Sequence, residues 1–248
     1  MPFRLKAFAI HLATSLAALT LVLGLLYAGW YRWPGWYLAG MTAIVPVMLG
    51  VDLALGPLLT LVIASPVKPR AELARDLAVI VTVQLVALGY GSYTLWHGRP
   101  LYYAFSVDRI ELVRASDIDP EDARLALKDN APLAPHWYSR PRWIWAPLPD
   151  DPQAADRIMR SAIGGGIDVI DLPRQYRPWQ AGVSALRAVL KPMAPMTTLG
   201  SADKDRLAKR FAAAGQDPAS PNTVLVTGRN PSLLAVVDPA TGRIVAIP

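Results

Sequence analysis

The chain has 248 residues, a net charge of +6 at pH 7 and no cysteine. Its hydrophobic share of 53%, its charged share of 18% and its mean hydropathy of +0.28 are too apolar for an ordinary soluble protein. The lack of cysteine excludes disulfides, thiolate metal sites and cysteine nucleophiles. Basic residues are mixed with acidic ones and no nucleic-acid-reading motif is present, so we expect no nucleic-acid partner.

The first apolar segment runs from Ala7 to Trp30 without a charged residue and follows Arg4 and Lys6. At ~1.5 Å per residue it would form about 36 Å of helix, enough to cross a bilayer core of ~30 Å. A cleaved signal peptide is disfavoured because no small-x-small cleavage site ends the segment. The segment therefore predicts an uncleaved membrane span at 7–30.

Two further apolar segments predict membrane spans at 37–64 and 77–96. Aromatic residues crowd the turn between the first two spans, which is typical of a membrane interface. A polar loop separates the second span from the third. We therefore expect residues 1–96 to form a transmembrane domain of three α-helices.

Basic residues in the short polar segments predict the orientation of these spans. Arg32 alone lies in the turn after the first span, whereas the N terminus and the second loop carry Arg4, Lys6, Lys68, Arg70 and Arg75. The positive-inside rule then places the N terminus in the cytoplasm. Three spans bring residues 97–248 to the far side, so we expect a multi-pass protein of the bacterial inner membrane with a periplasmic domain.

Asp52 is the residue of the second span that most needs an explanation, because it is a carboxylate near the middle of an apolar run. A charged residue at the centre of a membrane helix costs roughly 2.5 to 3.5 kcal/mol, and such residues normally face a partner or a bundle interior. Shortly after it, Gly56-Pro57 removes a helical hydrogen bond and frees a carbonyl group. Thr60 carries the nearest hydroxyl that could satisfy it.

Counting residues from the predicted cytoplasmic ends of the spans places Thr20 and Tyr90 at the depth of Asp52, with His11 and Gln84 shallower. Three interpretations follow for Asp52. It is a structural group satisfied by Tyr90 or Thr20, or it receives a polar group from another transmembrane helix, or it belongs to a proton or ion path. The last is the weakest, because a single acid without a relay is a poor transporter.

Residues 97–248 predict an α+β domain large enough for its own core. Aspartate-proline pairs at 119–120 and 151–152 are typical of helix starts. The pattern predicts strands at 101–113, 223–226, 233–237 and 244–247, helices at 120–127, 152–162, 181–190 and 202–214, and an irregular loop layer rich in proline and aromatic residues at 131–180.

The chain offers no convincing catalytic constellation. Its three histidines, His11, His97 and His136, are too few and too scattered for a metal site or a catalytic triad. The acidic segment 117–122 lacks the glycine and closing glutamate of a calcium loop, and the glycines at 164–166 lack the lysine of a phosphate loop. We therefore expect a protein that is not an enzyme and that uses no metal and no cofactor.

Several strings resemble the type IV pilin accessory proteins of the TfpX/TfpZ kind over nearly the whole chain. The most specific is GVDLALGPLLTLV at 50–62. Others are AIHL at 9–12, RDLAV at 75–79, RPLY at 99–102, VDR at 107–109, LPRQY at 172–176 and the ending VDPATG at 237–242. At 175–179 the chain has QYRPW where a more tyrosine-rich string is expected.

The resemblance implies a non-enzymatic accessory factor, a chaperone or assembly modulator for a cognate type IV pilin. Its implied partners are that pilin and, as a further candidate, the pilus assembly platform. In this interpretation Asp52, with Gly56 and Pro57 opening the helix surface, accepts the polar N-terminal end of the pilin helix.

The remaining candidate contacts at this membrane site are Thr60, Tyr90 and Thr20. The candidate periplasmic contact loop contains Tyr176, Pro178 and Trp179. Two other classes stay open: a membrane-tethered sensor or scaffold unrelated to pili, and a periplasmic enzyme, which would require a polar cluster in a cleft.

Overall fold

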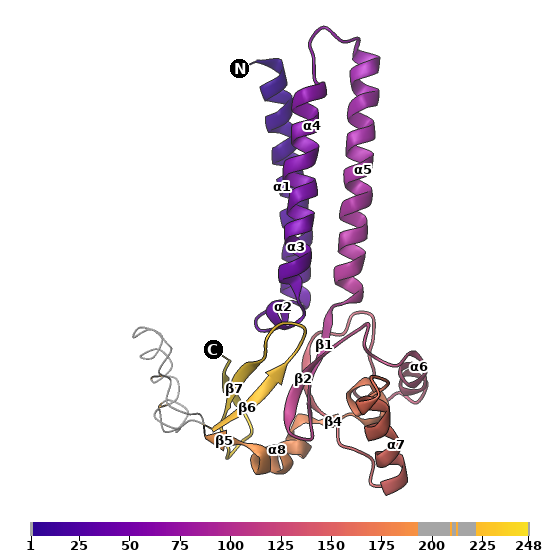
Figure 1. Cartoon of the computed structure of the whole chain (residues 1–248), viewed down its shortest axis with the longest axis vertical. Coiled ribbons are helices and arrows are strands. Elements are labelled where there is room, and N and C mark those ends of the chain that lie inside the picture. Colours follow the sequence, from indigo (N-terminus) through magenta and orange to yellow (C-terminus); the bar gives the residue numbers. More distant parts are fainter. Residues whose placement is uncertain (1, 193–208, 210–211, 213–221, 248) are drawn as a thin grey trace. The chain divides into compact units, whose positions relative to one another are not determined.

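The computed structural model describes residues 2–192, 209, 212 and 222–247. The chain forms two compact units, Met1–Arg99 and Pro100–Pro248. The first unit is helical and the second is built on a sheet (Figure 1).

The first unit contains three long helical segments that run side by side (Figure 1). The first is α1, Phe3–Gly29, and the third is α5, Arg70–His97. Between them the chain forms one interrupted helix from Met41 to Ile63, preceded by the short α2, Gly35–Leu38. Its parts are α3, Met41–Leu49, a π-helical segment, Gly50–Leu55, and α4, Gly56–Ile63.

Within the described part of the chain, α1 and the run Met41–Ile63 are the two helices long and apolar enough to cross a membrane. Most of their side chains lie on the surface of the unit. The third predicted span lies within α5, which begins at Arg70 rather than at residue 77 and therefore carries charged side chains in its first turns.

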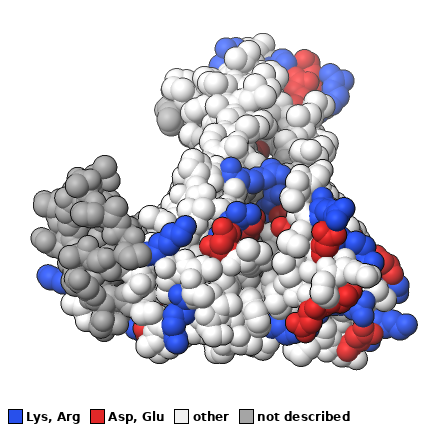
Figure 2. Space-filling model, turned by 60° about the horizontal axis from the view of Figure 1, so that its bottom comes forward, with Lys and Arg blue, Asp and Glu red and all other residues white. Residues whose placement is uncertain are grey.

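Charged side chains of the helical unit gather at one end, at the top of the view in Figure 2, while its flanks are almost entirely white. There Lys68 Nζ pairs with Asp76 at 2.8 Å and with Glu72 at 3.5 Å. Both carboxylates belong to the first turns of α5, so this ion-paired group ties the loop after α4 to the start of α5.

The second unit contains an eight-stranded sheet in which the main path runs β4-β3-β1-β2-β6-β7-β8 and β5 pairs with β6. The strands are β1 Pro100–Ser106, β2 Arg109–Arg114, β3 Arg142–Trp145, β4 Arg177–Pro178, β5 Lys191–Pro192, β6 Asn222–Thr227, β7 Leu233–Val237 and β8 Ile244–Ala246. β1 pairs antiparallel with β2 and parallel with β3, and β2 pairs parallel with β6. Every residue of β1 is buried, so this strand is the centre of the core.

Two helices of the second unit begin where the aspartate-proline pairs predict. α6, Pro120–Lys128, is capped by Asp119, whose side chain accepts a hydrogen bond from the Asp122 N–H. α7, Pro152–Ile163, is capped by Asp151 and ends at Gly164. α8 occupies Val183–Val189, within the helix predicted at 181–190.

The C-terminal strands form as predicted, whereas the helix predicted at 202–214 lies outside the described residues except at 209 and 212. One expectation is wrong: residues 131–180 are not an irregular layer throughout. They contain β3, which pairs in parallel with the buried strand β1. The side chain of Ile144 in β3 is completely buried, and its burial favours this position. A four-residue strand between prolines has no periodicity that would reveal it in the sequence.

Candidate functional site

A group of polar side chains lies inside the otherwise apolar helical unit. Asp52, Thr60 and Gln84 are only 4%, 2% and 7% exposed. His11 on α1 lies beside them and is half-buried. Because buried polar groups in apolar surroundings must be paired to avoid a large cost, the partners of each group define the site.

The π-helical segment explains why Gln84 lies here. The Gly56 N–H donates to the carbonyl of Val51, five residues earlier, as in a π-helix. In the same register the carbonyl of Asp52 would accept from residue 57, but Pro57 has no N–H. The side-chain amide of Gln84 supplies the missing donor, with Nε2 3.1 Å from the Asp52 carbonyl oxygen.

Gly56 makes room for this amide. A Cβ atom at position 56 would lie 2.1 Å from Gln84 Nε2 and 2.2 Å from Gln84 Cδ, closer than real carbon contacts allow. The glycine and the following proline therefore act together, since one admits the Gln84 side chain and the other leaves the carbonyl that it binds.

His11 extends the network to α1 and α4. Its Nε2 lies 2.6 Å from Gln84 Oε1, and its Nδ1 lies 2.5 Å from Thr60 Oγ1. The Gln84 oxygen can only accept, so Nε2 of His11 donates to it, while Nδ1 of the same ring pairs with the Thr60 hydroxyl. A chain of hydrogen bonds thus runs from Thr60 through His11 and Gln84 to the backbone of Asp52.

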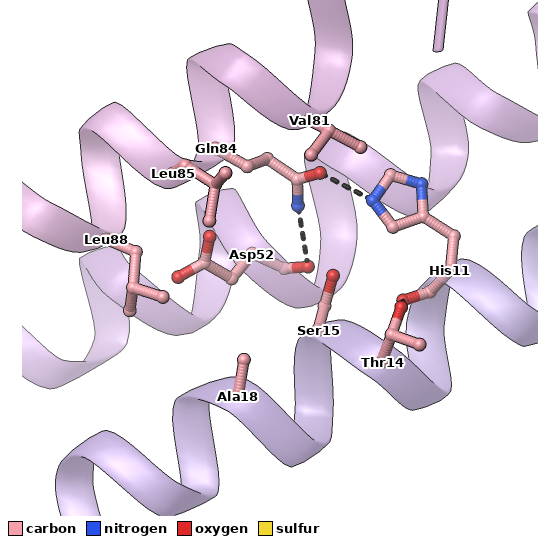
Figure 3. Close-up of a pocket in the computed structure, with 9 residues that line it drawn as sticks. All are labelled: His11, Thr14, Ser15, Ala18, Asp52, Val81, Gln84, Leu85 and Leu88. Carbon is pink, nitrogen blue, oxygen red and sulfur yellow. Dashed lines mark hydrogen bonds between the residues drawn. The ribbon is translucent and has the colours of Figure 1, made fainter. Parts of the chain in front are cut away.

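The carboxylate of Asp52 is not part of this chain. It points into a cavity of about 190 Å³ (Figure 3). The lining residues come from all three helical segments: His11, Thr14, Ser15, Ala18, Asp52, Val81, Gln84, Leu85 and Leu88. No described residue donates a hydrogen bond to the carboxylate or forms an ion pair with it. The cavity therefore presents a buried acceptor without a donor.

Of the six residues predicted at the membrane site, Asp52 lines the cavity, and Gly56, Pro57 and Thr60 belong to the hydrogen-bond network beside it. Thr20 and Tyr90 do not line the cavity. Thr20 is exposed on α1, and Tyr90 is 74% exposed on α5.

Sequence reasoning placed His11 and Gln84 too shallow to meet Asp52. The predicted third span begins at residue 77, whereas α5 begins at Arg70, so Gln84 lies about two turns further along its helix than the prediction gives. The signal that could have found Gln84 is its amide in an apolar helix, which needs buried partners as much as a carboxylate does.

The predicted periplasmic contact loop divides between core and surface. Tyr176 is 5% exposed, and its hydroxyl donates to the Ile170 carbonyl at 2.5 Å; burial raises the pKa of this phenol well above its usual value. Pro178 is exposed in β4. Trp179 is half-buried and donates from Nε1 to the Gly242 carbonyl at 3.0 Å. Only Pro178 and Trp179 are therefore available to a partner.

The described residues contain no group of three or more histidine, aspartate or glutamate side chains arranged to hold a metal ion. The Asp52 cavity can instead bind a donor group, because its free carboxylate accepts hydrogen bonds and attracts positive charge.

No protein-family model matches the chain, and no solved structure matches it. Three curated proteins of Dichelobacter nodosus are similar. The chain is 27% identical over 194 residues to the fimbrial assembly protein of serogroup I and 25% identical over 194 residues to that of serogroup E1. Each of these matches covers 77% of this chain and 73% of the relative.

The third relative is the fimbrial assembly protein of serogroups C1 and C2. It is 33% identical over 116 residues, which is 47% of this chain and 88% of the relative. At that identity over nearly the whole length of the relative, this chain belongs to the family of the fimbrial assembly proteins.

Proposed function

We propose that the protein is an inner-membrane accessory factor of the TfpX/TfpZ kind that supports assembly of a cognate type IV pilus and performs no catalysis. Its relatives are named fimbrial assembly proteins, which supports a role in assembly of the fimbria. Its partner is the major pilin, held in the membrane before or during assembly.

The observation that carries this proposal is the unpartnered, buried carboxylate of Asp52 in its cavity. A carboxylate in apolar surroundings is costly until a donor or a positive charge reaches it. The N-terminal end of a transmembrane pilin helix carries an amine and free backbone N–H groups, which are such donors. Docking of that end satisfies both partners in the bilayer, where neither has water.

The surrounding network prepares Asp52 for this role. The π-helical segment sets the direction of its side chain, and Gln84 closes the backbone gap that this segment leaves. His11 and Thr60 hold Gln84 in place. Since the backbone of Asp52 is satisfied within the protein, its carboxylate is the group left for a partner.

The proposed membrane arrangement has three spans, with α5 as the third. Support comes from the outward-facing apolar side chains of all three segments, including Leu21 at 64%, Val62 at 71% and Val86 at 68% exposure. Such a surface is stable in lipid and costly in water. The basic residues at one end of the unit support an orientation in which that end lies in the cytoplasm with the N terminus, and residues 97–248 lie in the periplasm.

Photocrosslinking in cells tests the pilin-binding role. A photoreactive amino acid at Ala18 or Leu88, which line the cavity, should form an adduct with the major pilin, whereas one at Val62 should not. Asp52→Asn should weaken the adduct and reduce surface pili at unchanged levels of this protein. Glu72→Gln, which alters a half-exposed carboxylate of the same unit that does not line the cavity, is the matched control.

Adducts of equal strength from all positions, or full piliation and crosslinking in the Asp52→Asn variant, would contradict reception of the pilin helix at Asp52. Asp52 would then be a packing residue of the bundle.

A further inference from the structure

The loop that leads into β3 presents aromatic side chains to the solvent. Trp137 is 70% and Tyr138 is 58% exposed, and their rings meet edge-on with centres 5.5 Å apart. The exposed His136 ring stacks on Tyr138 with a centre distance of 5.1 Å. Large rings that lie exposed side by side are costly in water, and such a patch commonly marks a binding surface.

Hydrogen bonds hold the backbone of this loop in place. The His136 N–H donates to Ser139 Oγ and the Ser139 N–H donates to the His136 carbonyl, each at 3.0 Å. The Tyr102 hydroxyl donates to the Leu133 carbonyl at 2.7 Å and so connects the loop to β1. Ala134 and Ser139 are both buried. Because the loop is anchored on both sides of the rings, the rings form a fixed, outward-facing patch.

The charge of this segment has one sign. No acidic residue occurs between Asp129 and Asp150, whereas Arg140 and Arg142 do. The Arg142 guanidinium lies over the Tyr102 ring, 5.7 Å from its centre. Arg140 is exposed and has no acidic partner among the described residues. Arg140 is therefore the cation of the loop that is available to an external anion.

The pairing of the strands places this loop at the end of the sheet where the chain enters from α5. β3 runs parallel to β1 with Arg142 beside Tyr102, so the loop before β3 lies at the end where β1 begins. β1 begins at Pro100, three residues after α5 ends at His97. Three residues span at most about 10 Å. Of the two ends of β1, the one beside the loop is thus the one closely tied to the proposed third span.

We propose that this loop docks on the surface of the bilayer, with Trp137 and Tyr138 in the headgroup region and Arg140 on lipid phosphates. Tryptophan and tyrosine favour this region because each combines an apolar ring with a polar group. An arginine near an anionic lipid surface adds an attraction that salt weakens. Docking restricts how the second unit turns on its short connection to α5.

The proposal rests on the proposed membrane arrangement but not on reception of a pilin at Asp52. The bilayer is favoured over a protein as the occupant because the loop lies at the end of the sheet that joins α5. A protein partner is an outcome of the test.

Fluorescence quenching in proteoliposomes of the full-length protein tests the docking. The chain has no cysteine, so an NBD label can be attached at His136→Cys alone. The vesicles contain equal parts of phosphatidylglycerol and phosphatidylcholine, and a fraction of the phosphatidylcholine carries a TEMPO nitroxide on its headgroup. We expect strong quenching of this label. A label at Ile163→Cys, which is 88% exposed on α7, should be quenched far less.

Two substitutions separate the apolar contribution from the charge. Trp137→Ser should reduce quenching at position 136 with or without phosphatidylglycerol. Arg140→Gln should lower the ratio of docked to undocked loop about fivefold, and only with phosphatidylglycerol at low salt. Trp137→Phe and Arg140→Lys should keep most of the quenching, which shows that the loop still folds. Arg157→Gln, on the exposed surface of α7, is the matched control and should change nothing.

A label at Val86→Cys, on an exposed position of α5, distinguishes the two proposals. Quenching there by an acyl-chain nitroxide, without quenching at position 136, would overturn the docking and leave the membrane arrangement intact. Quenching at neither position would overturn both. Equal quenching at positions 136 and 163 would show that the loop has no preference for the bilayer. A label at position 136 that is water-exposed in vesicles but shielded in native membranes would overturn the proposal in favour of a protein partner.

Discussion

The side-chain amide of Gln84 forms hydrogen bonds with groups on two other helical segments. Its Nε2 binds the Asp52 carbonyl, which Pro57 leaves without a backbone donor, and its Oε1 accepts from His11. One amide thus closes the gap in the second helical segment and connects it to α1 and α5. The side chain of Asp52 stays outside this network. Gln84 and His11 therefore stabilise the fold, while the neighbouring carboxylate of Asp52 is the group proposed to bind a partner.

The close approach at Gly56 yields the first prediction. Gly56→Ala places a methyl group where Gln84 now lies, so the amide must withdraw from the Asp52 carbonyl. We expect the free energy of unfolding to fall by about 1–3 kcal/mol, as for other cases of overpacking. Thermal unfolding of the purified protein in detergent measures the loss. Gly50→Ala is the control, because a Cβ atom there would meet nothing within 4 Å; an equal loss in both variants would rule out this steric cause.

Asp171 is a second residue whose environment has a measurable consequence. Partial burial raises the pKa of its carboxyl group from 3.8 to about 6, with the charge of Asp168 adding to the effect. Its Oδ2 accepts from the Asp168 N–H at 2.9 Å. Between pH 3.8 and about 6 the folded protein therefore binds more protons than the unfolded chain at this position, and this group lowers stability as pH rises through that window.

The second prediction is that Asp171→Asn removes this pH dependence while it keeps an acceptor for the Asp168 N–H. The free energy of unfolding of the variant, minus that of the original protein, should increase from pH 4 to pH 7 and then stay level. Unfolding midpoints followed by tryptophan fluorescence at several pH values give the difference. A difference that is constant over this range would show that the carboxyl group titrates at its ordinary pH.

At the scale of elements, the two aspartate-proline starts show how short signals specify helices in the second unit. Asp119 and Asp151 each accept hydrogen bonds from N–H groups of the first helical turn, and the proline at the next position needs no donor of its own. The π-helical segment differs, because residues near it in the chain do not complete its hydrogen bonds. Its irregular hydrogen bonds are completed by a side chain from another helix, so the element exists only within the unit.

The third prediction concerns the cap of α6. Asp119→Ala removes the acceptor that lies 2.7 Å from the Asp122 N–H, and we expect a loss of about 0.5–2 kcal/mol in the free energy of unfolding. Denaturant unfolding of the purified protein measures it. Asp150→Ala provides the comparison, because Asp150 is exposed and caps no helix. Equal stability of the Asp119 variant and the original protein would mean that water replaces the cap at no cost.

At the scale of the whole molecule, the chain combines an apolar helical unit with a sheet-containing unit. The helical unit contains a cavity with the buried carboxylate of Asp52, and the second unit contains a groove lined by Trp143 and Trp179. The proposed orientation in the membrane determines which partners can reach each of these sites.

The fourth prediction tests that orientation and uses the lack of cysteine in the chain. A cysteine introduced at Val67, in the loop before α5, should resist a membrane-impermeant maleimide in cells with a permeabilised outer membrane. One at Ile163, at the end of α7, should react. The two positions are 89% and 88% exposed, so a difference in labelling reflects compartment and not burial. Labelling of Val67→Cys in intact inner membranes would reverse the proposed topology.

Local signals in the sequence determined much of the fold: the apolar helices, the starts of α6 and α7, the strand character of β1 and β2, and the C-terminal strands. Each depends on residues close together in the chain, such as a cap, a proline or an alternating pattern. The same local signals marked Asp52, Gly56, Pro57 and Thr60 as unusual in a membrane helix. They could not show β3, because that strand is stabilised by its pairing with β1 and not by its own pattern.

Only the tertiary structure decided what surrounds Asp52. The partners of a buried polar group depend on where three helices start and how they pack, and the start of α5 at Arg70 sets Gln84 about two turns deeper than its predicted span implies. The groove of the second unit that Trp143, Trp179 and Ile244 line could not be predicted either, because β3, Trp179 and β8 are far apart in the chain and meet only when the sheet forms. Sites made of distant residues depend on long-range packing, which a pattern of neighbouring residues does not record.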